Sequence, residues 1–267
     1  MNARPGPVGI SDVKASQDLS KTSIPLVMRY LFVPAAWPLT VMAARLGMSP
    51  NGATLAHAAI SAVGLALMAS ASTTLFALGL FLFVLAKISD SVDGNLARLQ
   101  DRASYFGKYF DGLVDMIEDL AFPLALGLHL WRTGAPADES LVPAGLAAFA
   151  LAAVFIAMYR LPLFQLTLER DRGTDAMAGS RAAHPRLEAF FESGPGRMLL
   201  YCDTHGVNLA VDGRFLGLAW ALVTGSLTGY LAFLAALYAV AAALVVSVRV
   251  MRGYATLDVH RRSRSAA

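Results

Sequence analysis

The stretch that decides the fold runs from residue 90 to residue 115 and reads DSVDGNLARLQDRASYFGKYFDGLVD. Its four carboxylates, Asp90, Asp93, Asp111 and Asp115, lie in or beside segments apolar enough to enter a membrane, where acids usually face a polar cavity and have a function. The first two are three residues apart and the last two are four apart, so each pair shares one helix face. Two such helices packed together would bring four oxygen ligands to one point, which predicts a site for a hard cation such as Mg²⁺.

The composition around this stretch is that of an integral membrane protein. Of 267 residues, 56% are hydrophobic and 15% are charged, and the mean hydropathy is +0.54, which is too apolar for an ordinary soluble domain. The single cysteine, Cys202, excludes an intramolecular disulfide framework. The net charge is +3, but the basic residues gather in loops on one side of the membrane, so we expect a lipid bilayer as partner and no nucleic acid.

Hydropathy predicts an all-α fold with six transmembrane helices, each near the ~20 residues that cross the hydrocarbon layer. The second helix is expected to continue past the apolar segment to about Arg98. The fifth is the weakest, because Asp212 and Arg214 lie in its first turns. The six predicted spans are residues 53–69, 73–88, 109–131, 141–159, 208–224 and 228–248.

The distribution of lysine and arginine orients these spans. With six spans, every basic residue except Arg132 falls on the side that holds both termini and the acidic stretch, if Lys87 at the boundary is included. The positive-inside rule then places both termini and the acids in the cytoplasm, in a cell inner (cytoplasmic) membrane. Five spans would put the arginine-rich tail on the opposite side.

The remaining segments complete the predicted organisation. Residues 1–24 are expected to form a flexible cytoplasmic leader, and residues 25–48 an interfacial amphipathic helix kinked by Pro34 and Pro38; a poor transmembrane helix is the alternative for 25–48. The six-helix domain covers 49–252 and contains a polar cytoplasmic insertion at 167–211, which is either a solvated face or a lid. A basic cytoplasmic tail follows at 253–267.

The acidic stretch resembles the signature of the CDP-alcohol phosphotransferase family, D-x2-D-G-x2-A-R-x8-G-x3-D-x3-D. Eight fixed positions are filled without a gap. The resemblance implies a membrane transferase that moves a phospho-alcohol group, most often phosphatidyl, from a CDP-alcohol such as CDP-diacylglycerol to an acceptor hydroxyl. CMP is released, and the reaction class serves phospholipid biosynthesis. The matching positions are Asp90, Asp93, Gly94, Ala97, Arg98, Gly107, Asp111 and Asp115.

The resemblance also implies roles for the acids. Asp90, Asp93 and Asp111 match the family's metal ligands, and Asp115 matches the residue taken as proton acceptor, which also lies near a second metal. Divalent metal held by carboxylates would neutralise the pyrophosphate and stabilise the leaving group, and a two-metal Mg²⁺ site is expected, with Mn²⁺ as the alternative ion. A structural ion-pair network of the acids with Arg98, Arg102 and Lys108 is the alternative interpretation.

A second set of positions is implied to bind the nucleotide donor. Small residues let a nucleotide approach the backbone, and the forked donors of Arg98 suit a diphosphate. Asn51 could equally be a helix N-cap, and the two glycines could be simple helix-packing positions. The implied donor-binding residues are Asn51, Thr54, Gly94, Ala97, Arg98, Ser104 and Gly107.

The acceptor is the least defined partner. Arg160, at the cytoplasmic end of the fourth span, is predicted to meet an anionic acceptor, or else to be a snorkelling membrane anchor. Glu118 and Asp119 continue the acidic face, whereas His57 lacks a partner at ligand spacing and is predicted to be a packing or surface residue. Alternatives to the phosphatidyl transfer are transfer of a soluble CDP-linked headgroup to a lipid or polyol, and a cation- or proton-coupled transporter. The resemblance implies a homodimer.

Overall fold

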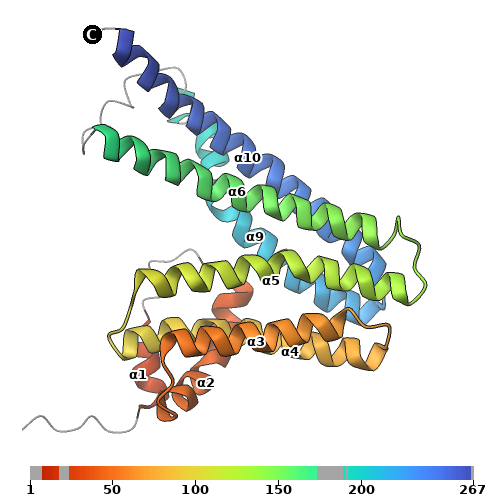
Figure 1. Cartoon of the computed structure of the whole chain (residues 1–267). Helices are drawn as coiled ribbons and strands as arrows, with labels where there is room; N and C mark the ends of the chain where they lie inside the picture. The colour runs from red at the N-terminus through yellow and green to blue at the C-terminus, as the bar shows by residue number, and fades with distance from the viewer. Residues whose placement is uncertain (1–7, 18–23, 173–188, 191, 266–267) are drawn as a thin grey trace, which may run out of the picture.

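A computed structural model of the chain describes residues 8–17, 24–172, 189–190 and 192–265. Within these residues all regular secondary structure is helical, as the hydropathy predicts. Parts of the predicted leader (1–7 and 18–23), of the predicted insertion (173–188 and 191) and of the predicted tail (266–267) lie outside the described residues. Figure 1 shows long helices arranged side by side, with the shorter N-terminal helices against one edge.

The described chain contains six long helices that run alternately up and down. The turns that join α3 to α4, α5 to α6 and α9 to α10 lie at one end of the bundle (Figure 1). Two of these turns are tied together, because the side chain of Arg132 donates to the Ala69 carbonyl oxygen at 2.5 Å. The six helices are α3 (Pro50–Met68), α4 (Thr73–Leu99), α5 (Tyr105–Arg132), α6 (Leu141–Arg172), α9 (Gly194–Thr224) and α10 (Leu227–Ser265).

Four of these helices, α3, α4, α6 and α10, are long and apolar enough to cross a membrane, which indicates an integral membrane protein. In the part of the chain that the structure describes, α5 and α9 are not among these helices. Both lie in predicted spans but carry charged residues, among them Glu118 and Asp119 on α5 and Asp212 and Arg214 on α9. The six-span topology therefore stays a prediction for these two helices.

Serine residues start four of the six long helices. In each case the serine Oγ accepts a hydrogen bond from the backbone N–H three residues later, which satisfies a donor that has no partner inside the helix. The cap of α5 holds the turn that joins the two halves of the acidic stretch. The capping residues are Ser49, Ser72, Ser104 and Ser193.

Helices α3 and α4 approach each other more closely than larger side chains would allow. A Cβ placed on Gly79 would lie 2.5 Å from both the Gly64 carbonyl oxygen and the Met68 nitrogen. Small residues permit such backbone contact between membrane helices. The contact sets the spacing at which Thr54 of α3 faces the acids at the end of α4. Phe83 of α4 and Phe122 of α5 extend the packing, with ring centroids 4.8 Å apart.

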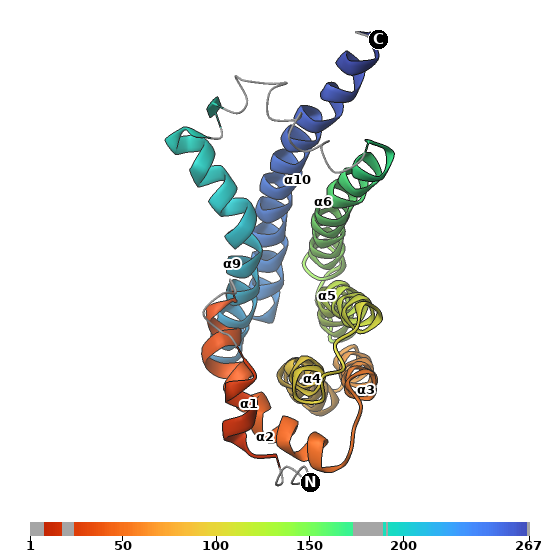
Figure 2. The same ribbon diagram turned by 90° about the vertical axis from the view of Figure 1, so that its left-hand side faces the viewer.

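The N-terminal segment packs against the bundle. Helix α1 (Ile10–Ala15) has Val13 fully buried, so these described residues form a packed helix where the sequence predicts a flexible leader. Helix α2 (Val33–Arg45), preceded by the π-helical turn η1 (Met28–Phe32), buries Ala36, Thr40 and Ala43. Its neighbours include α4 and α1, and Figure 2 shows α1 and α2 below the ends of α3 and α4.

A π-helical turn lies close to Pro34, one of the two prolines at which the sequence predicts a kink. Pro34 has no N–H to continue the helical ladder and its ring crowds the preceding turn, and the wider π-helical turn η1 ends two residues before it, at Phe32. The helix begins near Leu26, whose N–H donates to Asp212 Oδ2 at 2.8 Å, while that of Val27 donates to Oδ1 at 2.8 Å. Asp212 of α9 thus caps the helix that begins near Leu26, far away in the sequence. A carboxylate at a helix N-terminus is stabilising because the helix dipole is positive there.

Helices α6, α9 and α10 are longer than their predicted spans. Helix α6 continues to Arg172 and α9 starts at Gly194, so the described flanks of the predicted 167–211 insertion are helical extensions of the two spans. Helix α10 likewise continues through most of the predicted basic tail, to Ser265. In Figure 2 the ends of α6 and α10 and the start of α9 spread apart at the same end of the molecule.

Candidate functional site

The candidate site forms where α3 begins, α4 ends and α5 begins. Residues 100–104 form the short turn between α4 and α5, and Asp101 adopts a left-handed conformation there, with φ of 51°. Gln100 Nε2 fixes this turn to the start of α3 by donating to the Met48 carbonyl oxygen at 2.8 Å. Because the turn is short, the two halves of the acidic stretch lie against each other.

Three of the four predicted acids converge. Asp90 of α4 and Asp111 and Asp115 of α5 each offer a carboxylate oxygen, and these oxygens all lie within 4.8 Å of one another. Oxygen ligands without sulfur suit a hard divalent cation. The donor set therefore fits the metal that the sequence predicts, with the ligands coming from two helices.

Asp93 lies one helical turn further along α4 and outside this group of three. The Thr54 hydroxyl of α3 donates a hydrogen bond to its Oδ2, and the Gly94 N–H donates to its Oδ1. Thr54 is buried and so holds this carboxylate in one orientation. Asp93 and Asp111 both face a cavity next to the group of three.

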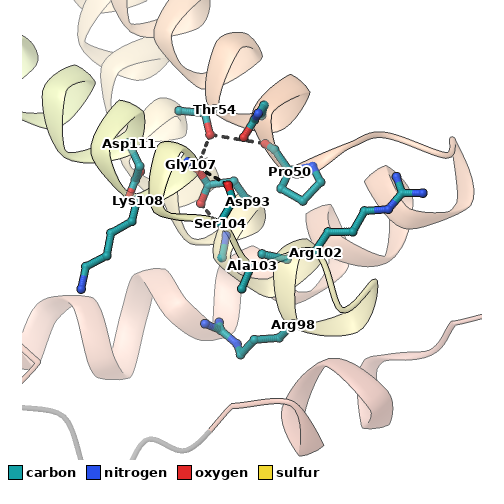
Figure 3. Close-up of a pocket in the computed structure, with 13 residues that line it drawn as sticks. Pro50, Thr54, Asp93, Arg98, Arg102, Ala103, Ser104, Gly107, Lys108 and Asp111 are labelled. Carbon is teal, nitrogen blue, oxygen red and sulfur yellow. Dashed lines mark hydrogen bonds between the residues drawn. The ribbon is translucent and has the colours of Figure 1, made fainter.

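That cavity has a volume of about 240 Å³, and Figure 3 shows the labelled residues around it. All seven positions that the sequence predicts for the nucleotide donor line it. Two further cationic side chains, of Arg102 and Lys108, join Arg98 there, so the cavity combines positive charge with small residues. It is lined by Pro50, Asn51, Thr54, Asp93, Gly94, Ala97, Arg98, Arg102, Ala103, Ser104, Gly107, Lys108 and Asp111.

Asn51 and Ser104 both line the cavity, but only Ser104 also caps a helix. Ser49 is the N-cap of α3, with its Oγ accepting from the Gly52 N–H at 3.1 Å, so the alternative reading of Asn51 as the cap is wrong. A Cβ on Gly107 would lie 3.3 Å from Asn51 Oδ1, so a larger residue at 107 would crowd Asn51. Ser104 caps α5 through the Gly107 N–H at 3.0 Å and lines the cavity as well.

A buried cation lies on the inner side of the acids. Lys87 Nζ is 2.9 Å from Asp115 Oδ1, 2.9 Å from Glu118 Oε2 and 3.5 Å from Asp119 Oδ1, and the lysine is 4% exposed. The alternative interpretation from the sequence was an ion-pair network of the acids with Arg98, Arg102 and Lys108. In the described ion pairs the cation beside Asp115 is instead Lys87, which contacts the acids on the side nearest the protein interior.

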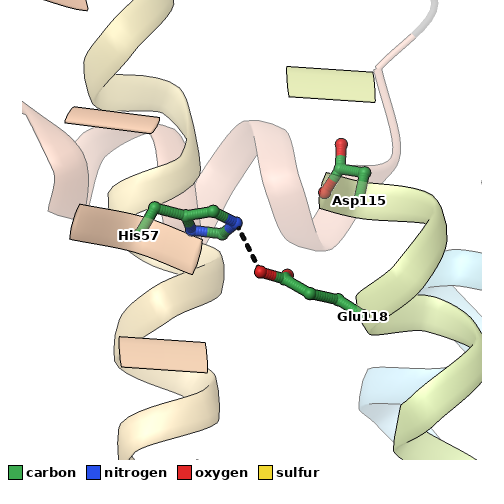
Figure 4. A group of neighbouring side chains, drawn as sticks. All are labelled: His57, Asp115 and Glu118. Carbon is green, nitrogen blue, oxygen red and sulfur yellow. Dashed lines mark ion pairs between the residues drawn. The ribbon is translucent and has the colours of Figure 1, made fainter. Parts of the chain in front are cut away.

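His57 belongs to the same buried network. Its Nε2 lies 2.8 Å from Glu118 Oε1 (Figure 4) and its Nδ1 lies 2.7 Å from the Ala86 carbonyl oxygen. His57 is buried, as a packing residue would be, but each of its ring nitrogens also has a polar partner, which the sequence did not predict. It connects α3 to both α4 and α5.

The network extends to α9 through Asp119. Arg214 Nη1 lies 2.5 Å from Asp119 Oδ1, and the Arg214 carbonyl oxygen accepts a hydrogen bond from the Tyr230 hydroxyl at 2.9 Å. Both charged residues that make α9 a weak span therefore have a partner. Asp212 caps the helix that begins near Leu26, and Arg214 forms an ion pair with Asp119 of α5.

A spacing signal could have identified Lys87 and His57 from the sequence. Lys87 precedes Asp90 by three residues and His57 follows Thr54 by three, so each shares a helix face with a motif residue. The partners on α9 carry no such signal, because Asp212 and Arg214 lie far from the motif in the chain.

Arg160 lies at a second hollow, between α5 and α6. This groove has a volume of about 910 Å³ and shares Lys108 with the first cavity. It passes Gly112 and Met116, which flank Asp115 on α5, and its other walls are mainly apolar or aromatic. It is lined by Tyr105, Lys108, Tyr109, Gly112, Leu113, Met116, Phe155, Ile156, Tyr159, Arg160, Leu163 and Leu166.

Comparison with known proteins gives one match. Residues 47–188 match the family described as CDP-alcohol phosphatidyltransferase. The matched range covers α3, α4, α5 and α6, and with them the acids, the cavity and the groove. No curated protein and no solved structure matches the chain.

Proposed function

The chain belongs to the CDP-alcohol phosphatidyltransferase family, and from this we propose that it transfers a phosphatidyl or other phospho-alcohol group from a CDP-alcohol to an acceptor hydroxyl, with release of CMP. The observation that carries the proposal is the convergence of Asp90, Asp111 and Asp115 beside a cavity lined by the motif's small residues and by Arg98. This arrangement places metal-binding oxygens next to room for a nucleotide.

The cavity between α3, α4 and α5 is proposed to hold the cytidine diphosphate part of the donor. Gly94, Ala97 and Gly107 leave the backbone accessible, which favours close approach of a ligand. Arg98 supplies forked donors for the diphosphate, and Asn51, Thr54 and Ser104 supply polar groups on the wall. Charge and size together favour a nucleoside diphosphate over an uncharged ligand.

Asp90, Asp111 and Asp115 would hold a divalent cation, with Asp93 as a fourth acid beside them. We propose Mg²⁺, and a pair of ions, since four carboxylates are enough ligands for two; Mn²⁺ would suit the same donors. When bound, such ions supply charge neutralisation for the diphosphate and stabilisation of the leaving CMP.

Asp115 is proposed to accept the proton of the acceptor hydroxyl. The acceptor oxygen forms a bond to the β-phosphorus of the donor, the bond from that phosphorus to the CMP oxygen breaks, and CMP leaves. The Oδ1 of Asp115 accepts a hydrogen bond from Lys87 Nζ at 2.9 Å, which holds the carboxylate in place. The side chain is 39% exposed, so an acceptor can reach it.

The groove between α5 and α6 is proposed as the place of the acceptor and of lipid chains. Its apolar walls suit acyl chains, and Arg160 and Lys108 suit an anionic group at its polar end. Loss of one charge-assisted contact costs about 1.5–3 kcal/mol, so Arg160→Ala should raise the acceptor KM about ten- to a hundredfold and barely change the donor KM. Equal changes in both, or in neither, would make Arg160 a membrane anchor.

Two alternatives to phosphatidyl transfer are transfer of a soluble CDP-linked headgroup and transport of an ion. Transfer of a soluble CDP-linked headgroup to a lipid would use the same acids and cavity, and differs only in which substrate carries the acyl chains. The family match does not support a transporter. The six-span topology with cytoplasmic termini, the inner-membrane location and a homodimer remain part of this proposal, the last by resemblance alone.

The proposal is tested by CMP release from membranes that contain the protein, given Mg²⁺, a panel of acceptor alcohols and either CDP-diacylglycerol or a soluble CDP-alcohol. Asp115→Asn should abolish turnover while CDP binding persists. Asp138→Asn, at an exposed acid in the turn at the opposite end of the helices, is the matched control and should retain activity. Near-normal kcat in Asp115→Asn would refute the role of Asp115, and absence of CMP release with every donor would refute the transferase.

A further inference from the structure

A fully buried amide lies behind the cavity arginine. Asn95 is 0% exposed, and its Oδ1 accepts a hydrogen bond from Arg98 Nη2 at 2.7 Å. The two residues are three apart on α4, so they share one face of the helix. Asn95 occupies a variable position of the family pattern, between Gly94 and Ala97.

The N-terminal segment fixes this amide from two directions. Gln17 Nε2 donates to the same Asn95 Oδ1 at 2.6 Å, and Asn95 Nδ2 donates to Thr40 Oγ1 of α2 at 3.0 Å. Trp37 Nε1 of α2 in turn donates to Gln17 Oε1 at 3.0 Å. Each oxygen and nitrogen of the amide therefore has a partner, so the orientation of Asn95 is defined by these contacts.

All of these supporting residues precede residue 47, where the match to the family begins. Gln17, which follows α1, and helix α2 thus add a hydrogen-bond network around the buried Asn95 to a site whose other residues come from the matched part of the chain. The network ends on Arg98, the one cavity cation that the family motif contains.

We propose that Asn95 is a positioning residue for Arg98, and that Gln17 and α2 hold Asn95 in place so that the guanidinium faces the donor's diphosphate. An arginine side chain loses rotational freedom about several bonds when it binds an anion. If the side chain is already fixed before binding, part of that entropic cost is removed. This inference rests on the proposed function, since it assumes that Arg98 binds the diphosphate.

The expected effect is a loss of donor affinity that depends on Arg98. The cost of ordering one long side chain corresponds to about two- to tenfold in affinity, so Asn95→Leu and Gln17→Ala should each weaken CDP binding by that factor. In an Arg98→Ala background the same substitutions should change CDP affinity no further, because the residue through which they act is gone. A purely structural role would give the same loss in both backgrounds.

The experiment measures the Kd of CDP, which carries the diphosphate without the alcohol, for the full chain in lipid nanodiscs with Mg²⁺. Gln17→Ala carries the test if Asn95→Leu fails to fold, since Gln17 is half-buried. Ser16→Ala is its matched control, because within the described residues the Ser16 Oγ donates only to the Val13 carbonyl oxygen; CDP affinity should be unchanged.

Each outcome of this experiment decides one point. Losses confined to the background with Arg98 support the positioning role. Losses of equal size without Arg98, or no loss from Asn95→Leu and Gln17→Ala with Arg98 present, overturn it. Failure of the wild-type chain to bind CDP overturns the proposed function, and this inference with it.

Discussion

Removal of the buried cation Lys87 should destabilise the protein strongly. Lys87→Met keeps the length of the side chain and removes its charge, which leaves Glu118 and Asp119 short of one cation. At an effective dielectric constant of ~20, a contact at 2.9 Å contributes about 6 kcal/mol of attraction before desolvation. After desolvation, breaking a buried pair by removing one partner costs about 3–5 kcal/mol.

The contact with Glu118 should dominate this loss. The Glu118 side chain is 4% exposed whereas that of Asp115 is 39% exposed, so water replaces the lost cation at Asp115 far better than at Glu118. The double variant Lys87→Met with Glu118→Gln removes one charge of each sign and should recover at least about 1.5 kcal/mol relative to the sum of the single variants.

The assay is reversible unfolding in mixed detergent micelles, with the free energy of unfolding compared among the wild type, both single variants and the double variant. Lys108→Met is the control, because Lys108 is exposed and a surface substitution changes stability by about 0.5 kcal/mol or less. A loss below about 1 kcal/mol in Lys87→Met, or strict additivity in the double variant, would refute the view that Lys87 neutralises a buried acid cluster.

Three further experiments test the packing, the cavity and the topology. In Gly79→Ala the new Cβ would lie 2.5 Å from the Gly64 carbonyl oxygen, and the resulting shift should lower the free energy of unfolding by about 1–3 kcal/mol. In Gly107→Ala the Cβ would lie 3.1 Å from Ser104 Oγ, which narrows the cavity; initial rates should show a raised donor KM with a smaller change in kcat. In a cysteine-free background, a cysteine at Ser104 should label only from the cytoplasm and one at Ala135 only from outside, whereas labelling of both from one face would contradict six spans.

Local patterns in the sequence predict the helices and the motif. The extension of α4 beyond its apolar part to Leu99 follows from the spacing of Asp90 and Asp93 on one helix face. The N-terminal segment could not be predicted in the same way. Its polar side chains suggest contact with lipid headgroups and solvent, and only the folded chain shows that Thr40 and Gln17 have a buried partner on α4.

The same distinction applies to the site. Residues of the acidic stretch that line the cavity are close in sequence or follow a fixed pattern, so their common location can be predicted. The ion pairs of Lys87, His57 and Arg214 join different helices. Such pairing depends on how the helices pack, and a charged residue in an apolar segment indicates that a partner exists without indicating which one.

The pair between Asp119 and Arg214 bears on how the chain enters the bilayer during synthesis. Neither α5 nor α9 is among the described helices that are long and apolar enough by themselves to cross a membrane, and Asp119 of α5 pairs with Arg214 of α9. Lys87 emerges from the ribosome before α5 and can accompany its acids into the membrane, whereas Arg214 is made only after α6. With six spans, assembly is therefore completed late, when α9 joins α5, and a chain that stopped after α6 would keep an acid of α5 without its arginine.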